Sequence, residues 1–174
     1  MEIYYINSEE FLKIHDTEFL RSYAEGKEFK SVKRFVQYTI GRYLVKTVAK
    51  EKFNLSDTSI TIKNDKPEFS NGHVKFSISH SGKYIMAAFD DTDCGLDIEE
   101  MKPRDILALS KRYEKNFASL EDFYTFWTQY EAEIKLQQPV KDSYSTVFRN
   151  NFMLTVVSAG SISSAPSCTN YLDA

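Results

Sequence analysis

The stretch FSISHSGKYIMAAFDDTDCGLDIEE, residues 76–100, alternates apolar and polar side chains on either side of two short turns. Such alternation is typical of β-strands, in which successive side chains point to opposite faces. The sequence predicts strands over 74–79 and 84–90, joined through Ser81-Gly82-Lys83, and a third strand that begins at Cys94. We expect these three strands to form an antiparallel meander at the centre of the fold.

Helices are predicted on both sides of these strands, because apolar residues there recur at helical spacing. The predicted helices cover residues 31–53, 104–113 and 119–136. Ser119 and Asp122 form a plausible capping pair at the start of the last one.

Short strands and turns are predicted in much of the remaining chain: a strand at 59–63, a turn at 64–67, and a hairpin over 144–158 that turns at Asn150-Asn151. The small and polar C-terminal residues predict a loop or tail. The order of strand, helix and hairpin occurs twice. We therefore expect an α+β protein of two similar halves, residues 1–92 and 93–174, each a small antiparallel sheet packed on helices.

Composition narrows the class of protein. The 174 residues are 42% hydrophobic and 14% aromatic, which argues against disorder. The net charge of -3 argues against binding to a nucleic-acid backbone, so any bound anion must meet a local cluster of cations. No apolar stretch reaches the ~20 residues of a membrane span, and the N-terminus lacks the pattern of a secretory signal. We expect a cytoplasmic protein that acts neither on nucleic acid nor in a membrane.

Two acids near the end of the third strand form a candidate metal site. Asp97 and Glu99 are two positions apart, so their carboxylates point to one face, ~7 Å apart along the strand. Like charges held this close raise each other's pKa unless a cation lies between them, and Mg²⁺ is a natural partner for oxygen ligands. The alternative is an ordinary exposed acidic strand end.

Further candidates are weak when taken alone. Trp127, Glu131 and Lys135 lie along one stripe of the predicted helix, a pattern that ordinary surface pairs also produce. His80 follows Ser79 near a strand end, where a histidine is usually a turn residue. The basic residues around the start of the helix over 31–53 could be solvated charges. They are Lys27, Lys30, Arg34 and Arg42.

Together, and in this order, these elements resemble a known family. The blocks FSISHSGKYIMAAFD, GLDIEE and FWTQYEAEIKL resemble the three signature blocks of the 4'-phosphopantetheinyl transferases. The resemblance is to the monomeric type that activates carrier domains of nonribosomal peptide and polyketide synthases. The turn NDKPEF is similar to the family's Gly-Lys-Pro block, with Asp65 in place of the usual glycine.

The resemblance implies a role for each matching residue. Asp97, Glu99 and Glu131 would bind Mg²⁺ together with the pyrophosphate of coenzyme A. Lys135 would contact the transferring phosphate, and Glu131 is the best candidate to take the proton of the attacking serine. The other contacts with coenzyme A would come from Arg34, Arg42, Lys66, Pro67, Ser79 and His80.

The function implied is transfer of the 4'-phosphopantetheine arm of coenzyme A to a serine of an acyl-, aryl- or peptidyl-carrier protein, with release of adenosine 3',5'-bisphosphate. The protein would be a monomer with coenzyme A in the cleft between its halves. One alternative is a degenerate protein that only binds coenzyme A and carrier, since Tyr130 stands where the family has a basic residue. The other is a metal nuclease with Asp105, Glu133 and Lys135, which would require a strand where the periodicity is helical.

Overall fold

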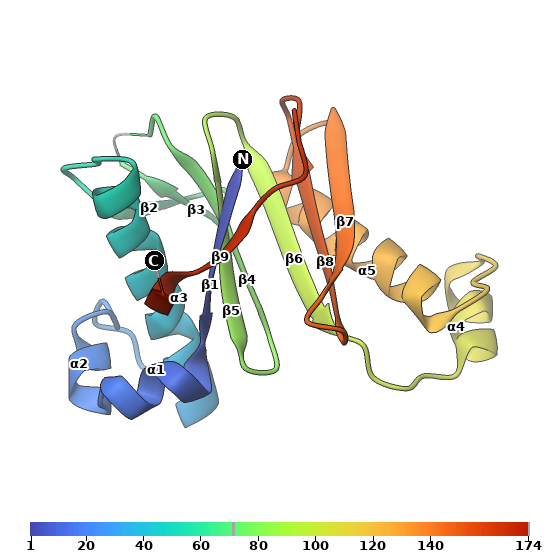
Figure 1. Cartoon of the computed structure of the whole chain (residues 1–174), viewed down its shortest axis with the longest axis horizontal. Coiled ribbons are helices and arrows are strands. Elements are labelled where there is room, and N and C mark those ends of the chain that lie inside the picture. Colours follow the sequence, from blue (N-terminus) through green and yellow to red (C-terminus); the bar gives the residue numbers. More distant parts are fainter. Residues whose placement is uncertain (71, 174) are drawn as a thin grey trace.

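The computed structural model describes residues 1–70 and 72–173. Two sheets lie face to face at its centre, and helices cover the outer face of each (Figure 1). One apolar cluster fills the space between the sheets, where Tyr5 and Met86 of the first meet Leu96 and Leu154 of the second. Separate clusters join each sheet to its helices. The predicted α+β class, with small sheets packed on helices, is confirmed.

The first sheet has the strand order β4-β5-β1-β9. Its strands are β1 (Glu2–Asn7), β4 (Lys75–Ser81), β5 (Tyr84–Asp90) and β9 (Cys168–Asn170). β5 pairs antiparallel with β4 on one edge and with β1 on the other. β2 (Ile60–Lys63) and β3 (Lys66–Phe69) form a separate hairpin. The predicted turn at 64–67 is therefore narrower than expected, since Lys66 and Pro67 already lie in a strand.

The second sheet has the order β6-β8-β7 and is antiparallel throughout. It contains β6 (Cys94–Glu100), β7 (Asp142–Phe148) and β8 (Phe152–Ser158). The expected meander of three strands is wrong at its last step, because β6 pairs with β8 and not with β5. The physical reason is that β1 already occupies the edge of β5 that β6 would need.

Helices α3 (Val32–Lys52), α4 (Ile106–Tyr113) and α5 (Leu120–Leu136) match the three predicted ones. The Ser119 hydroxyl accepts a hydrogen bond from the Asp122 N–H (3.0 Å), which confirms the cap of α5. The sequence interpretation did not include α1 (Ser8–Ile14) and α2 (Thr17–Arg21). Among the described residues, no helix combines the length and apolar character needed to cross a membrane.

The C-terminal residues cross from the second sheet to the first (Figure 1). β9 runs parallel to β1, and a 3-10 turn, η1 (Tyr171–Asp173), follows it. The Tyr171 hydroxyl donates a hydrogen bond to Glu51 of α3 (2.7 Å). The expected loop is therefore correct for residues 159–167 and wrong for residues 168–173, while Ala174 lies outside the described range. The division into halves at residues 92 and 93 stays a prediction.

Gly95 allows α5 to pack directly on β6. A Cβ atom at this position would lie 2.0 Å from the backbone oxygen of Ala132, which cannot move without displacing the helix. We expect Gly95→Ala to lower the free energy of unfolding by about 3 kcal/mol, the upper end of the usual cost of overpacking. Chemical denaturation checks this expectation, with Gly72→Ala as a control because Gly72 is exposed. Equal stabilities of the two variants would contradict it.

Candidate functional site

Strands β4 and β6 meet at the junction of the two sheets, and serine side chains connect them. Alternate serines of β4 each accept a hydrogen bond from a backbone N–H of β6: Ser77 from Leu96 (3.0 Å), Ser79 from Ile98 (3.3 Å) and Ser81 from Glu100 (2.9 Å). Both members of each pair advance by two residues, so the strands run parallel. Side-chain oxygens thus take the place that carbonyl oxygens have in a continuous sheet. The alternating serines of SISHS are a sequence signal that the sequence interpretation did not use.

Asp97 lies at this junction, on the face of β6 that α5 covers. Its Oδ1 atom accepts hydrogen bonds from the Ser79 hydroxyl (2.7 Å) and from Lys135 Nζ (2.6 Å). Asp97 is only 5% exposed, so the alternative of an exposed acidic strand end is wrong for this residue. Among the described residues, Oδ2 of Asp97 is buried and has no hydrogen-bond partner. An unpaired buried carboxylate oxygen is costly, and a cation would satisfy it.

Glu99 is half-buried on the same face and accepts a hydrogen bond from the Ser81 hydroxyl (2.8 Å). Burial raises the pKa of Glu99, and the charges of Asp97 and Glu131 raise it further. The Ser81 hydrogen bond and the charge of Lys135 act in the opposite direction on this pKa. Asp97 and Glu99 therefore lie on one face of β6, as the sequence predicted, and the charge of Glu131 acts on Glu99 from α5.

The oxygen donors of this cluster suit a hard divalent cation such as Mg²⁺. Within the described residues, however, no group of three or more His, Cys, Asp or Glu side chains is already gathered to hold a metal ion. The ammonium of Lys135 lies beside Asp97 instead. The donor chemistry and the unpaired Oδ2 fit a cation, but ligation by all three acids would require their side chains to rearrange.

A cavity of about 580 Å³ brings together four residues that the sequence predicted to bind coenzyme A. They are Arg34 and Arg42 of α3, Pro67 of β3 and His80 of β4. These residues come from three separate elements, so only the fold places them around one space. Lys27 and Tyr38 also line this cavity. Two guanidinium groups and one ammonium group at a single cavity are suited to an anionic ligand.

Arg42 is buried at this cavity and has several partners on its inner side. Its Nε atom donates a hydrogen bond to the Tyr38 hydroxyl (3.1 Å) and lies 3.5 Å from the Glu25 carboxylate. Among the described residues, its buried Nη1 atom has no hydrogen-bond partner. This buried donor at a cavity wall could bind a ligand oxygen. Arg34, by contrast, is exposed at the first turn of α3.

Lys66, which the sequence also predicted to contact coenzyme A, does not line the cavity that contains Arg34, Arg42 and His80. Its Nζ atom binds Asp93 Oδ1 (3.2 Å) and the carbonyl oxygen of Leu136 (3.4 Å), and the residue is buried. Lys66 therefore connects the β2–β3 hairpin to the end of α5. It lines a neighbouring cavity of about 330 Å³ together with Lys135, while Pro67 lines both cavities.

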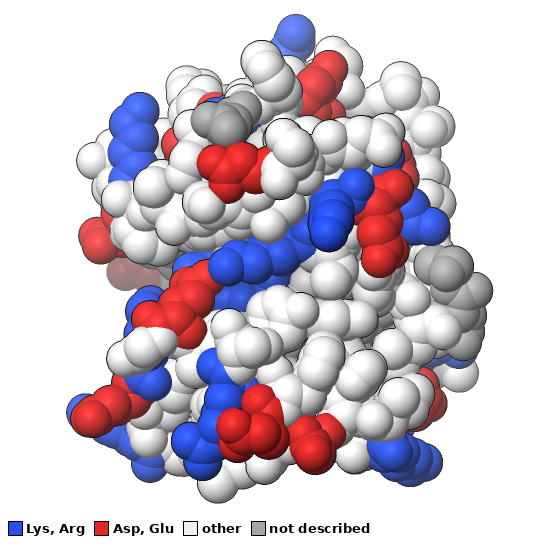
Figure 2. Space-filling model, turned by 90° about the vertical axis from the view of Figure 1, so that its left-hand side faces the viewer, with Lys and Arg blue, Asp and Glu red and all other residues white. Residues whose placement is uncertain are grey.

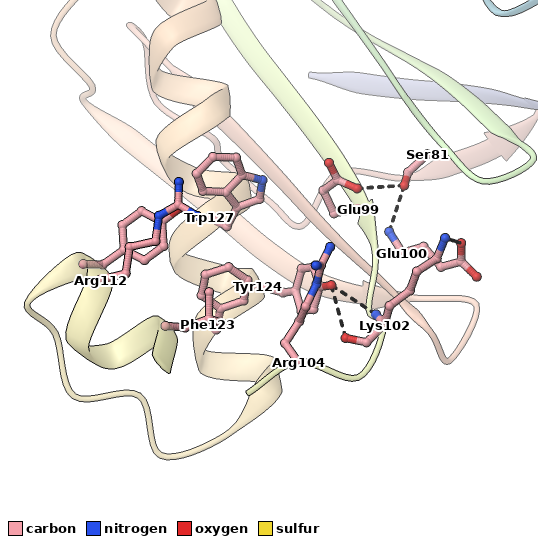
Figure 3. Close-up of a pocket in the computed structure, with 11 residues that line it drawn as sticks. Ser81, Glu99, Glu100, Lys102, Arg104, Arg112, Phe123, Tyr124 and Trp127 are labelled. Carbon is pink, nitrogen blue, oxygen red and sulfur yellow. Dashed lines mark hydrogen bonds and ion pairs between the residues drawn. The ribbon is translucent and has the colours of Figure 1, made fainter. Parts of the chain in front are cut away.

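A third cavity, of about 410 Å³, lies beside Glu99 (Figure 3). Tyr124 and Trp127 of α5 form one wall, and Arg104 and Arg112 lie at its edge (Figure 3). The Tyr124 hydroxyl is hydrogen-bonded to the backbone N–H (3.1 Å) and carbonyl oxygen (3.3 Å) of Lys102. Apart from Trp127, the sequence interpretation missed these residues, although the aromatic side chains recur along the predicted helix.

The structure also decides against the nuclease alternative. Glu133 and Lys135 lie in helix α5, and not in the strand that this alternative requires. The side chain of Glu133 accepts a hydrogen bond from Gln129 (3.0 Å) on the same helix, while Lys135 binds Asp97.

On the outer face shown in Figure 2, Lys and Arg side chains are interspersed with Asp and Glu, in agreement with the mildly acidic composition.

The fold and site thus combine a buried acid and a lysine at the junction of two sheets with a cation-lined cavity beside β4, an arrangement suited to a phosphorylated ligand. Comparison with models of protein families finds no match. Comparison with curated proteins finds the 4'-phosphopantetheinyl transferases ffp of Bacillus subtilis (29% identical) and Sfp of Bacillus subtilis strain 168 (28% identical). Each similarity covers 78% of this chain and 69% of the relative. The 4'-phosphopantetheinyl transferase psf-1 of Bacillus pumilus is 32% identical over 56% of this chain and 48% of its own length.

These similarities to curated 4'-phosphopantetheinyl transferases, over up to 78% of this chain, support its placement in that superfamily.

Proposed function

We propose that this protein transfers the 4'-phosphopantetheine arm of coenzyme A to a serine of an acyl-, aryl- or peptidyl-carrier protein. One observation carries the proposal: β4 connects the acids of β6 and Lys135 of α5, which its Ser79 contacts, with a cavity that its His80 lines together with Arg34, Arg42 and Pro67. The names of the relatives support the reaction class. A monomeric state and a cytoplasmic location stay predictions from the sequence.

The proposed chemistry is a phosphoryl transfer. The carrier serine oxygen forms a bond to the phosphorus that bears the pantetheine arm, and the bond from this phosphorus to the leaving phosphate breaks. Adenosine 3',5'-bisphosphate is then released, and Glu131 takes the proton of the serine. Such reactions depend mainly on positioning and on neutralising charge.

The residues of the chain would divide this task by position. Arg34 and Arg42 would bind phosphate oxygens in the cavity of α3, and His80 and Lys135 would contact the phosphates closer to β6. Asp97, Glu99 and Glu131 would hold Mg²⁺, which when bound neutralises the pyrophosphate and stabilises the charge of the leaving group. Lys135 would have to exchange its contact with Asp97 for a contact with phosphate.

Release of adenosine 3',5'-bisphosphate, followed by chromatography, tests this proposal. Release should require coenzyme A, Mg²⁺ and an apo carrier protein together, and it should not occur without the carrier. Binding of coenzyme A and carrier without any release would support the alternative of a protein that only binds. The binding-only alternative depends on Tyr130, which stands where the family has a basic residue. Tyr130 is 48% exposed and stacks on Phe126, so replacing it would not disturb the core.

The titration of His80 provides a test of the phosphate contacts. Although part of the His80 side chain is exposed, desolvation of its ring and the charge of Lys135 lower the pKa of His80 below its ordinary value of 6.5, so the free protein should carry a neutral imidazole at pH 7. Bound phosphates favour the charged imidazolium, so coenzyme A should raise this pKa. Histidine NMR signals recorded between pH 4 and pH 8, about the usual titration range, report the shift. An unchanged titration of His80 would exclude it from the phosphate contacts.

A further inference from the structure

We propose that Ser79 and Ser81 of β4 are positioning residues that fix the metal-binding carboxylates of β6. This inference rests on the proposed function, because it assumes that Asp97 and Glu99 hold a divalent cation. Each serine holds one of these carboxylates from the neighbouring sheet: Ser79 donates to Asp97 (2.7 Å), and Ser81 donates to Glu99 (2.8 Å). The resemblance had suggested only that Ser79 contacts coenzyme A.

The contacts of Ser79 determine where its proton points. A serine hydroxyl has one donor hydrogen and two acceptor lone pairs. The backbone N–H of Ile98 (3.3 Å) and the ammonium of Lys135 (3.0 Å) are donors, so they occupy the two acceptor positions. The hydroxyl hydrogen is left for Asp97 Oδ1. This hydrogen bond orients the carboxylate and leaves the buried Oδ2 as the oxygen without a hydrogen-bond partner, which a cation would reach only after side chains around it rearrange.

Ser81 makes the corresponding contacts one step further along the strand. It accepts a hydrogen bond from the Glu100 N–H (2.9 Å) and donates to Glu99 Oε2. Ser81 thereby keeps a half-buried acid oriented from the neighbouring strand.

Ser77 is a matched control within the same strand. Like Ser79 it is buried, and it accepts a hydrogen bond from the Leu96 N–H (3.0 Å), so it joins β4 to β6 in the same manner. The position of β6 that corresponds to Asp97 and Glu99 is Gly95, which has no side chain to orient. If alanine substitution of all three serines weakens metal binding equally, the loss of affinity reflects the connection between the strands. A loss of affinity confined to the Ser79 and Ser81 variants reflects the positioning of the carboxylates.

The test measures Mn²⁺ affinity by electron paramagnetic resonance in the presence of saturating coenzyme A. We expect Ser79→Ala and Ser81→Ala to weaken Mn²⁺ binding by about 10- to 100-fold, the usual effect of losing a group that orients a metal ligand. Ser77→Ala should bind Mn²⁺ about as tightly as the wild type, while thermal unfolding shows the cost of each lost strand contact. Ser79→Thr keeps the hydroxyl and should restore most of the affinity. If Ser79→Ala does not fold, Ser79→Cys keeps the volume with a weaker donor and replaces it in the comparison.

Steady-state transfer gives a second readout. A positioning defect should raise the Mg²⁺ concentration needed for half-maximal rate, and excess Mg²⁺ should recover most of kcat. Equal Mn²⁺ affinities for all three alanine variants would overturn the positioning role, provided that the wild type binds Mn²⁺ and Asp97→Asn does not. If the wild type itself binds no Mn²⁺ with coenzyme A, the metal site of the proposed function is refuted and the positioning role with it.

Discussion

Asp97→Asn is expected to reduce phosphopantetheinyl transfer by a factor on the order of 1,000. The amide keeps the shape of the side chain but removes the negative charge from the one acid that is buried beside Lys135 (2.6 Å). Loss of several kcal/mol of charge stabilisation corresponds to this factor, because each 1.36 kcal/mol is tenfold in rate. Steady-state rates at several Mg²⁺ concentrations measure the effect.

A matched control keeps this result interpretable. Asp91→Asn removes the same charge from an exposed turn residue nearby and should leave the rate unchanged. Removing one member of a buried ion pair also destabilises a protein, so thermal unfolding must show that Asp97→Asn is folded at the assay temperature. A folded Asp97→Asn variant with wild-type rates would remove Asp97 from the metal site.

The second large effect is expected for Glu131→Gln. The substitution preserves helix α5 but removes the carboxylate that we propose as general base and metal ligand. Turnover should fall by a factor on the order of 100, the usual scale for a lost general base, while the affinity for coenzyme A falls only modestly. Single-turnover kinetics and calorimetric titration separate the two quantities.

Glu133→Gln is the control for this variant. It changes the same charge two residues further along α5, where the side chain accepts a hydrogen bond from Gln129. Its turnover should stay close to that of the wild type. An equal loss of turnover in both variants would mean that any negative charge on α5 affects the rate, and it would contradict the role of Glu131 as general base and metal ligand.

Local periodicity was sufficient to predict most individual elements. The spacing of apolar residues was enough to predict helices α3 and α5 and strands β5 and β6. The common face of Asp97 and Glu99 also follows, because a strand alternates its side chains whatever its partner is. These properties depend on neighbours in the sequence.

Pairing between distant segments was not predictable in the same way. The sequence does not reveal that β1 takes the edge of β5, so the meander prediction failed at β6. β9 has only three residues, too few for a periodic signal. The contact of Lys66 with Asp93 likewise depends on where the β2–β3 hairpin lies. The candidate site itself was predicted from the family resemblance and not from local periodicity.

The central claim is tested most directly by the intact mass of carrier proteins after reaction. A panel of apo acyl-, aryl- and peptidyl-carrier proteins is incubated with this protein, coenzyme A and Mg²⁺, and in parallel with a chelator. We expect at least one carrier to gain the mass of a single phosphopantetheine group on its serine, and we expect no gain with the chelator or with Asp97→Asn. Unchanged masses for every carrier, with a protein that is folded and binds coenzyme A, would contradict the proposed transfer.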